Sequence, residues 1–345
     1  MNEAALLLDD SLAPLAADLA DPAIEDVAVN GPGAWWARGP EGWSRRDAPE
    51  LDFDTLEGIA ILAASLRRQD VGRGNPLCGG ELHTGHRFQV ALPPAVPSGT
   101  VSLTFRRPSD AVSPLAAVPD RYETGRWNRW GDRHHARRHD SAALLGLYDA
   151  GDVVGFLRAV VRTRRTPLLA GATGAGKTFL SKTLLAEADP GRRIVTIEDA
   201  MEMAVRQPNC VRLLFAAGGE GGVTPADCLH AALRMRPDLI PVQELREPHS
   251  AWVYLNEIAT GHPGSPTTIH GETAPQAVRR LFSLLKGSPQ GAGIGDDVLL
   301  AMLGAAIDVI VPISTEGGMR HIGEIWFSDD AARRGETVAS LLARE

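Results

Sequence analysis

The sequence is poor in the residues that stabilise secreted scaffolds. Its 345 residues include three cysteines, Cys78, Cys210 and Cys228, which are widely spaced and form no Cys-x-x-Cys pair. This spacing argues against a disulfide framework and against a cysteine zinc cluster. Basic residues are also in the minority, since 35 Lys and Arg against 43 Asp and Glu give a net charge of −8. We therefore expect neither a molecule-wide basic coat for duplex DNA nor specific nucleic-acid binding.

A long apolar run is lacking as well. The longest apolar stretch, residues 298–313, is interrupted by Asp308 and Pro312 and is too short to span a bilayer. The first ten residues are acidic, which is the opposite sign from a secretory leader. These features predict a cytosolic protein without a signal peptide or a transmembrane helix.

The composition that remains is that of a globular protein, with 44% hydrophobic and 23% charged residues, and the length suits two domains. We predict a small α+β domain over residues 1–108, an Arg- and Trp-rich linker over 109–143, a larger α/β domain over 144–330 and a C-terminal tail over 331–345. The arginine run at 121–138 is predicted to be a solvated or inter-subunit segment, with nucleic acid or anionic lipid as the alternative partners.

Local patterns predict the elements of each domain. Alternation and turn residues indicate N-terminal strands at 24–30, 88–92 and 101–105, a hairpin at 35–43 and a helix between Asp52 and Arg68. From Leu144 onward, strand-like and helix-like segments alternate. The expected strands are 166–170, 194–197, 239–244, 267–269 and 309–313, and the expected helices are 178–187, 225–236, 251–259, 274–286 and 297–307. This alternation predicts a mostly parallel sheet flanked by helices.

The most specific motif is a phosphate-binding loop that matches G-x-x-x-x-G-K-[ST] in full between an apolar strand and a helix. Its glycines let the backbone approach phosphate oxygens, and its N–H groups form an anion nest at a helix N-terminus. Lys177 would reach the β- and γ-phosphates, and Thr178 would ligate Mg²⁺. The predicted nucleotide-binding residues are Gly171, Ala172, Thr173, Gly174, Ala175, Gly176, Lys177, Thr178 and Phe179. No Asn-Lys-x-Asp guanine reader follows, so ATP is the expected nucleotide.

Two further apolar strands end in carboxylates. Glu198 and Asp199 follow the run 194–197, at the edge where open α/β sheets bind ligands, although Asp199 would serve equally as a helix N-cap. Glu244 ends the run 239–243 and is the candidate for polarising the attacking water and for binding the metal, the alternative being a surface carboxylate. Pro241 lies inside that run, where it removes a hydrogen bond from the ladder.

Two basic side chains complete the predicted site. His270 follows the short strand 267–269 and would sense the γ-phosphate, although an isolated histidine after a strand is more often structural. Arg106 follows the strand 101–105 and would reach a bound triphosphate if the small domain folds over the phosphate-binding loop. Its alternative is a solvated strand end.

The order of these motifs resembles the secretion ATPases of type II and type IV secretion, and in detail the hexameric traffic ATPase of type IV secretion. The resemblance rests on Gly171–Thr178, Thr196–Asp199, Leu233–Asp238 with Glu244–Arg246, and Gly261–His270, which match the Walker A, Asp, Walker B and His boxes of that family. Weaker matches in the N-terminal half extend it to roughly residues 10–315.

This resemblance implies a RecA-like P-loop NTPase domain after a smaller α+β domain, and a Mg²⁺-dependent ATPase. It implies a homohexamer, peripheral on the cytoplasmic face of the inner membrane, that works with inner-membrane components on a secreted protein or nucleoprotein. Nucleotide would bind between the two domains, where Arg106 is the matching arginine. Lys177 and Thr178 would hold phosphate and Mg²⁺, Glu244 would activate water, and Glu198, Asp199 and His270 would complete the site.

Three other functions are compatible with parts of the sequence. A type II secretion or pilus ATPase belongs to the same superfamily, but those extension enzymes usually carry a four-cysteine zinc module that three cysteines cannot form. A nucleotide-gated assembly scaffold would bind ATP with little turnover. A small-molecule P-loop kinase would place an arginine-rich lid after the phosphate-binding loop, whereas the arginine run precedes it here.

Overall fold

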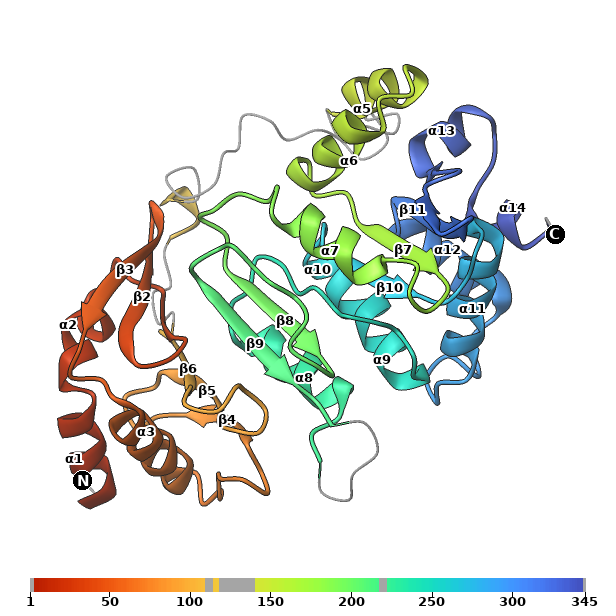
Figure 1. The fold of residues 1–345 in the computed structure, drawn as a ribbon. Helices are drawn as coiled ribbons and strands as arrows, with labels where there is room; N and C mark the ends of the chain where they lie inside the picture. The colour runs from red at the N-terminus through yellow and green to blue at the C-terminus, as the bar shows by residue number, and fades with distance from the viewer. Residues whose placement is uncertain (1–2, 109–113, 118–139, 217–221, 344–345) are drawn as a thin grey trace.

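The chain forms an N-terminal and a C-terminal domain (Figure 1). The computed structural model describes residues 3–108, 114–117, 140–216 and 222–343. Residues 121–138, where the sequence analysis places the arginine run, lie outside the described part, as does most of the predicted linker. Within the described residues, no helix is both long and apolar enough to cross a bilayer.

The N-terminal domain is built on a six-stranded antiparallel sheet ordered β3-β2-β1-β6-β5-β4. The strands are β1 (Asp26–Val29), β2 (Gly33–Gly39), β3 (Gly42–Ala48), β4 (Leu77–Glu81), β5 (Arg87–Ala91) and β6 (Ser102–Arg106). Helix α3 (Phe53–Leu66) packs its apolar side into the core of this domain, and α1 (Glu3–Ser11) lies against α3. The short helices η1 (Ala13–Leu15) and α2 (Ala16–Ala20) connect α1 to β1.

Local chemistry explains two of these elements. The β2–β3 hairpin turns at Gly42, whose φ of +100° is a left-handed conformation that glycine adopts at little cost. Helix α3 begins after Asp52, whose carboxylate accepts a hydrogen bond from the Thr55 N–H at 2.8 Å. The predicted hairpin and helix are therefore both present.

The C-terminal domain has a sheet that is mostly parallel, as predicted. Its strands are β7 (Pro167–Gly171), β8 (Ile194–Glu198), β9 (Cys210–Leu214), β10 (Thr267–Ile269), β11 (Val309–Glu316), β12 (Met319–His321) and β13 (Trp326–Phe327). β8 pairs with β9, and β7 lies between β10 and β11, all in parallel, while β12 and β13 pair with β11 in antiparallel fashion. Residues 239–242 join the β8 and β10 portions through isolated bridges. Pro241 has no N–H to donate, which accounts for the absence of a regular strand at this point.

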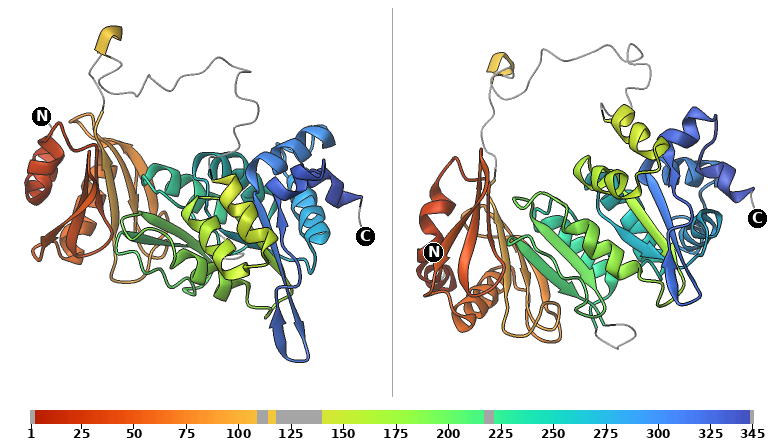
Figure 2. Two further views of the ribbon diagram at one scale, coloured as in Figure 1. Left: turned by 90° about the horizontal axis from the view of Figure 1, so that it is seen from above. Right: turned by 45° about the horizontal axis from the view of Figure 1, so that its top comes forward.

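Helices cover both faces of this sheet (Figures 1 and 2). They are α5 (Ser141–Asp149), α6 (Val153–Arg162), α7 (Lys177–Leu185), α8 (Pro225–Arg234), α9 (Pro248–Val253), η3 (Tyr254–Ile258), α10 (Ala259–Gly261), α11 (Ala274–Lys286), α12 (Asp296–Ala306), α13 (Ser328–Arg333) and α14 (Val338–Leu342), with η2 (Leu115–Ala117) before them. Alternate residues of β7 belong to different cores: Leu169 packs with α5 and α6, whereas Leu168 and Ala170 pack with α8 and α11. The fold is thus a two-faced α/β domain.

Residues 331–343, within the predicted C-terminal tail, pack onto the C-terminal domain instead of extending from it. Val338 and Leu341, on α14, are buried in the main core of the C-terminal domain, where α14 contacts α11 and α12. The segment is too short to show a helical period clearly, and its burial depends on the apolar faces of helices distant in sequence.

A buried arginine joins the two domains. Arg193 is fully buried, and its guanidinium donates to Asn30 Oδ1 at 2.7 Å, to Asn209 Oδ1 and to the Met235 carbonyl, the last through Nε at 2.8 Å. Burial lowers the pKa of Arg193 to about 10, so the side chain stays charged at neutral pH. Asn30 belongs to the N-terminal domain, and the shared hydrogen bonds therefore fix its position against α8 and β9.

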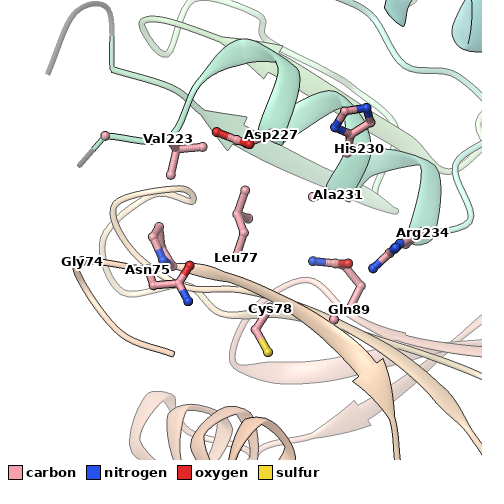
Figure 3. Close-up of a pocket in the computed structure, with 13 residues that line it drawn as sticks. Gly74, Asn75, Leu77, Cys78, Gln89, Val223, Asp227, His230, Ala231 and Arg234 are labelled. Carbon is pink, nitrogen blue, oxygen red and sulfur yellow. The ribbon is translucent and has the colours of Figure 1, made fainter. Parts of the chain in front are cut away.

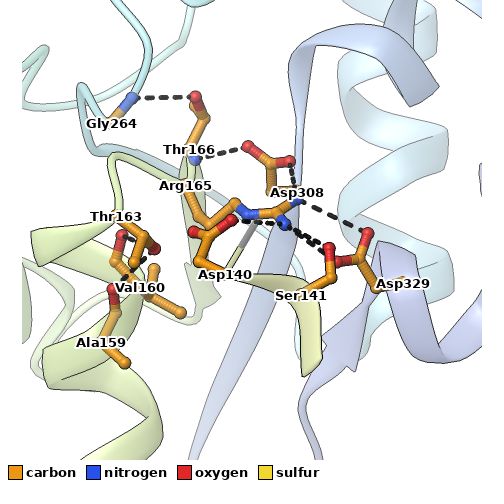
Figure 4. A network of polar contacts seen from close by, with 10 residues as sticks. All are labelled: Asp140, Ser141, Ala159, Val160, Thr163, Arg165, Thr166, Gly264, Asp308 and Asp329. Carbon is orange, nitrogen blue, oxygen red and sulfur yellow. Dashed lines mark hydrogen bonds and ion pairs between the residues drawn. The ribbon is translucent and has the colours of Figure 1, made fainter. Parts of the chain in front are cut away.

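A second buried arginine fixes the amino-terminal ends of β7 and β11 (Figure 4). Arg165 is 3% exposed and donates to Asp308 at 3.1 Å, Asp329 at 2.9 Å and Ser141 at 2.9 Å. Asp308 also accepts the Thr166 N–H at 2.8 Å. Charge-assisted bonds to three elements hold the base of the sheet, opposite the end where β7 enters the phosphate-binding loop.

Candidate nucleotide site

The phosphate-binding loop lies between β7, which ends at Gly171, and α7, which begins at Lys177. Gly174 and Gly176 have φ values of +82° and +100°, a region that favours glycine. Gly171 is required for another reason, since a Cβ there would lie 2.7 Å from the Ile313 carbonyl oxygen. Ala172, Thr173 and Gly174 are exposed, as a ligand-receiving loop requires, whereas Ala175 is buried. The predicted strand, loop and helix are present in that order.

Lys177 is folded back onto this loop. Its Nζ donates to the Gly171 carbonyl at 2.8 Å and to the Ala172 carbonyl at 3.0 Å, and the residue is 8% exposed. Burial lowers the pKa of Lys177, and the negative charge of Glu244 partly opposes this effect. The ammonium group is thus held at the mouth of the loop near a carboxylate.

The two residues after Lys177 lie on the first turn of α7. Thr178 is half-buried, and the Phe179 side chain is exposed, with 60% of its surface accessible. The first N–H groups of a helix have no partner within the helix and favour an anion at that end. The first turn of α7 therefore offers N–H donors, a hydroxyl and an exposed aromatic ring to a nucleotide.

Three of the predicted site residues meet at the carboxyl ends of neighbouring strands. Arg246 donates through Nε and Nη2 to Glu244 Oε2, at 2.9 and 2.7 Å, and through Nη1 to Asp199 Oδ2 at 2.9 Å. His270 Nε2 lies 2.9 Å from the other oxygen, Glu244 Oε1. The bond to Glu244 raises the pKa of the Arg246 guanidinium. Asp199, Glu244 and His270 are thus brought together as predicted, around an arginine.

Gln243 holds Asp199 in place. Its Oε1 accepts the Asp199 N–H at 2.9 Å, and its Nε2 donates to Glu202 at 3.2 Å. Thr268 in turn donates its hydroxyl to the Gln243 carbonyl at 2.7 Å. An amide at this position therefore connects the loop after β8 to the segment that carries Glu244. A hollow of about 40 Å³, lined in part by Asp199, Glu244 and Arg246, adjoins this network and has room for a water molecule.

Glu198 lies elsewhere. It is fully buried, and its carboxylate accepts hydrogen bonds from Arg212 at 2.7 and 2.9 Å, from the Thr196 hydroxyl at 2.6 Å and from the backbone N–H groups of Glu202 and Met203. This pairing raises the pKa of Arg212. Both carboxylate oxygens are committed to the protein, so the geometry favours a role in shaping the 199–203 loop over contact with a ligand.

Arg106 is also separated from the phosphate-binding loop. It lies at the end of β6, on the opposite side of the β8–β9 pair from α7 (Figures 1 and 2). There it borders a cleft of about 360 Å³ with four other arginines and Glu81; the arginines are Arg67, Arg87, Arg106, Arg234 and Arg236. The small domain therefore does not fold over the loop of its own chain. A sequence shows that Arg106 ends a strand, but it does not show which side of the second domain receives that strand.

A larger cleft of about 440 Å³ lies beside this one, between β4–β5 and α8 (Figure 3). Asp227, His230 and Arg234 line it from α8, and Cys78 and Gln89 line it from the N-terminal sheet. None of the predicted site residues is among its lining residues.

Two arginines that lie beside the predicted site residues, Arg246 and Arg320, were not among the predictions. Arg246 lies within the matched Glu-Leu-Arg motif. Its position two residues after Glu244 is the sequence feature that could have indicated a pair between the two side chains. Arg320, on β12, lies against Gly176, because a Cβ on that glycine would be 3.0 Å from Arg320 Cδ. No local pattern in the sequence indicates that contact.

Comparison with known proteins relates the chain to secretion ATPases. A family model described as "Type II/IV secretion system protein" matches residues 138–312. Protein VirB11 of Agrobacterium fabrum is 49% identical over 336 residues, 97% of each chain, and the type IV secretion system protein VirB11 of Bartonella quintana is 36% identical over 94% of each. The crystal structure of the VirB11 ATPase from the Brucella suis type IV secretion system, in complex with sulphate, matches with a TM-score of 0.85 at 32% identity, over 96% of this chain and 99% of that one.

Proposed function

The chain belongs to the VirB11 family of type IV secretion system ATPases, within the type II/IV secretion system proteins, and we propose that it hydrolyses ATP to ADP and phosphate in a Mg²⁺-dependent reaction. We propose that it acts as a homohexamer at the cytoplasmic face of the inner membrane. There it would work with membrane components of the secretion machinery to move a secreted protein or nucleoprotein or to assemble a pilus.

The observation that carries this proposal is the convergence of the phosphate-binding loop and the carboxylate cluster on one end of the sheet. Lys177 would exchange its two loop carbonyls for phosphate oxygens, and the N–H groups of the loop and of α7 would hold the remaining charge. Glu244 would take a proton from the attacking water, with His270 and Asp199 orienting the groups around it. The sulphate in the Brucella suis structure is consistent with an anion-binding ATPase.

The residues at the loop also suit a magnesium ion. The Thr178 hydroxyl lies on the first turn of α7, beside the loop, where it would bind Mg²⁺ together with phosphate oxygens and water. Glu244 would help to hold the same ion, directly or through a bound water. Mg²⁺ would neutralise phosphate charge during hydrolysis. Within the described residues, no group of three or more His, Cys, Asp or Glu side chains is arranged to hold a metal ion, so nucleotide and water would supply much of the coordination.

Arg106 would complete the site of another subunit. Within one chain the end of β6, where Arg106 lies, is across the β8–β9 pair from α7 (Figures 1 and 2), so the nucleotide that it would contact is that of a second copy. Its surroundings suit this role, because Arg87, Arg234 and Arg236 border the same cleft and would attract a polyanion. Glu198 would act indirectly, through the loop that carries Asp199.

The contacts of Glu244 also allow a second function, nucleotide-gated assembly with little hydrolysis. Glu244 is held by Arg246 and lies 2.9 Å from His270, so its carboxylate must be released before it accepts a proton from water. A chain in which that release does not occur would be a nucleotide-gated assembly scaffold with little turnover. Phosphate release by the purified protein distinguishes the two functions.

The decisive variant is Lys177→Ala. We expect loss of phosphate release to background without loss of fold, since Lys177 bonds to loop carbonyls and not to core residues. The measurements are phosphate release with Mg²⁺-ATP, and thermal unfolding as a control. Lys182→Ala, a half-exposed position on the same helix, should keep full activity. Turnover that survives in the Lys177 variant would refute the site.

A further inference from the structure

The hairpin formed by β11 and β12 extends the sheet over the phosphate-binding loop. β11 runs parallel to β7, with Ile313 opposite Gly171, so residues beyond 313 continue past the end of β7 (Figure 2). The chain then turns at Gly317 and Gly318, which have φ values of +57° and +80°. β12 returns with Arg320 opposite Thr315. The C-terminal part of the sheet thus overhangs the loop from the same chain.

Arg320 is the hairpin residue that meets the loop. A Cβ on Gly176 would lie 3.0 Å from Arg320 Cδ and 3.1 Å from its Nε, so the end of the side chain rests on this glycine. Gly176 directly precedes Lys177 and N-caps α7. Any residue with a side chain at 176 would therefore displace the arginine, in addition to the strain imposed by its φ of +100°.

The cations around the loop differ in what they bind. Lys177 donates to two loop carbonyls, and Arg246 donates to Glu244 and Asp199. The Arg320 side chain makes no hydrogen bond or ion pair with any described residue, and the residue is exposed. Its guanidinium can therefore accept an anionic partner without breaking an existing pair.

We propose that Arg320 is a nucleotide-binding residue, supplied in cis by the β11–β12 hairpin, that donates to the α- or β-phosphate of the bound nucleotide. The phosphate region follows from Gly176, because the N–H groups at this point of a P-loop cradle the α- and β-phosphates, whereas the lysine reaches farther. A guanidinium forms forked bonds to phosphate oxygens, which an ammonium cannot reproduce. This inference rests on the proposed function.

The test compares Mg²⁺-ATP and Mg²⁺-ADP binding by titration calorimetry in Arg320→Ala, Arg320→Lys and His321→Ala. His321 is exposed, and it lies on the opposite face of the hairpin because side chains alternate along a strand. We expect Arg320→Ala to weaken both nucleotides by about ten- to hundredfold, the range for hydrogen bonds to a charged group. Arg320→Lys should restore part of the affinity, and His321→Ala should bind as the wild type does.

Several outcomes would overturn the inference. Unchanged affinity in Arg320→Ala would show that the arginine does not contact nucleotide, and tighter binding would show that it covers an empty loop. A loss restricted to Mg²⁺-ATP would place the contact at the γ-phosphate, against the assignment. A defect in assembly with intact nucleotide binding would make Arg320 an interface residue. If the wild type itself binds no nucleotide, the proposed function fails, whereas the outcomes above leave that function intact.

Discussion

At the scale of single residues, Glu244 is the side chain whose chemistry is best tested by an isosteric change. Glu244→Gln keeps the shape and removes the proton acceptor, so we expect Mg²⁺-ATP binding to persist while hydrolysis falls by about 10²- to 10⁴-fold. Binding and phosphate release should be measured on the same preparation. Glu247→Gln, an exposed position beside the same hollow, is the matched control. Normal phosphate release in Glu244→Gln would assign the catalytic carboxylate to another residue.

The residues that could be predicted from sequence are those whose role depends on neighbours in the chain. The loop at 171–178 is defined by its own glycines and lysine, and Glu244 by its place after an apolar run, so local sequence is enough to propose both as site residues. Glu198 was assigned to the site because it and Asp199 are adjacent carboxylates at the end of a strand, and the sequence alone does not show which of them faces the ligand. The alternation of a strand separates them, and Glu198 points to Arg212 on β9, a partner 14 residues away. Arg320 reaches Gly176 across 144 positions, beyond any local pattern.

At the scale of elements, the base of β7 and β11 depends on Arg165. Arg165→Met retains an apolar stem and removes the guanidinium that Asp308, Asp329 and Ser141 share. Breaking a buried ion pair from one side typically costs about 3–5 kcal/mol, so we expect a large loss of unfolding free energy and a lower denaturation midpoint in urea. Arg158→Met, which removes an exposed pair with Glu187, should shift the midpoint little. Equal shifts in the two variants would show that the network does not stabilise the sheet.

Many elements followed from periodicity, and two of the differences have clear physical causes. Helix α11 has the bounds predicted for it; Thr273 caps it, and its apolar residues recur at helical spacing. β4 was missed because Gly79 and Gly80 are atypical of strands, yet a Cβ at Gly79 would lie 2.6 Å from Gln89 Oε1. The predicted strand at 239–244 pairs only through isolated bridges because Pro241 cannot donate. In β4 and at residues 239–244, contacts with distant parts of the chain determine the secondary structure.

At the scale of the whole molecule, the position of Arg106 predicts complementation between inactive variants. The Arg106→Ala variant keeps the phosphate-binding loop, and the Lys177→Ala variant keeps Arg106. If Arg106 acts on the loop of a neighbouring chain, some sites in a mixed assembly contain an intact loop and an intact Arg106. Random mixing in equal amounts should restore about a quarter of the wild-type sites in a ring of head-to-tail contacts. Phosphate release from co-assembled variants is the measurement.

A failure of the two variants to complement each other would contradict this prediction. If Arg106 acts within its own chain, no mixed site is intact, and the mixture stays as inactive as its parts. Full activity of Arg106→Ala alone would remove the arginine from the reaction. Arg45→Ala, an exposed change on β3, should neither impair activity alone nor complement Lys177→Ala beyond its own contribution.

The β8–β9 pair separates two unlike flanks, one with the phosphate-binding loop and one with the arginines around Arg106. A twofold dimer joins identical surfaces, so it would set loop against loop and leave both sites without an arginine. In the proposed ring, head-to-tail contacts would let every subunit give one flank and receive the other, so that each site is completed. The asymmetry of each protomer would give such a ring a direction, and a signal that passes from subunit to subunit would travel one way.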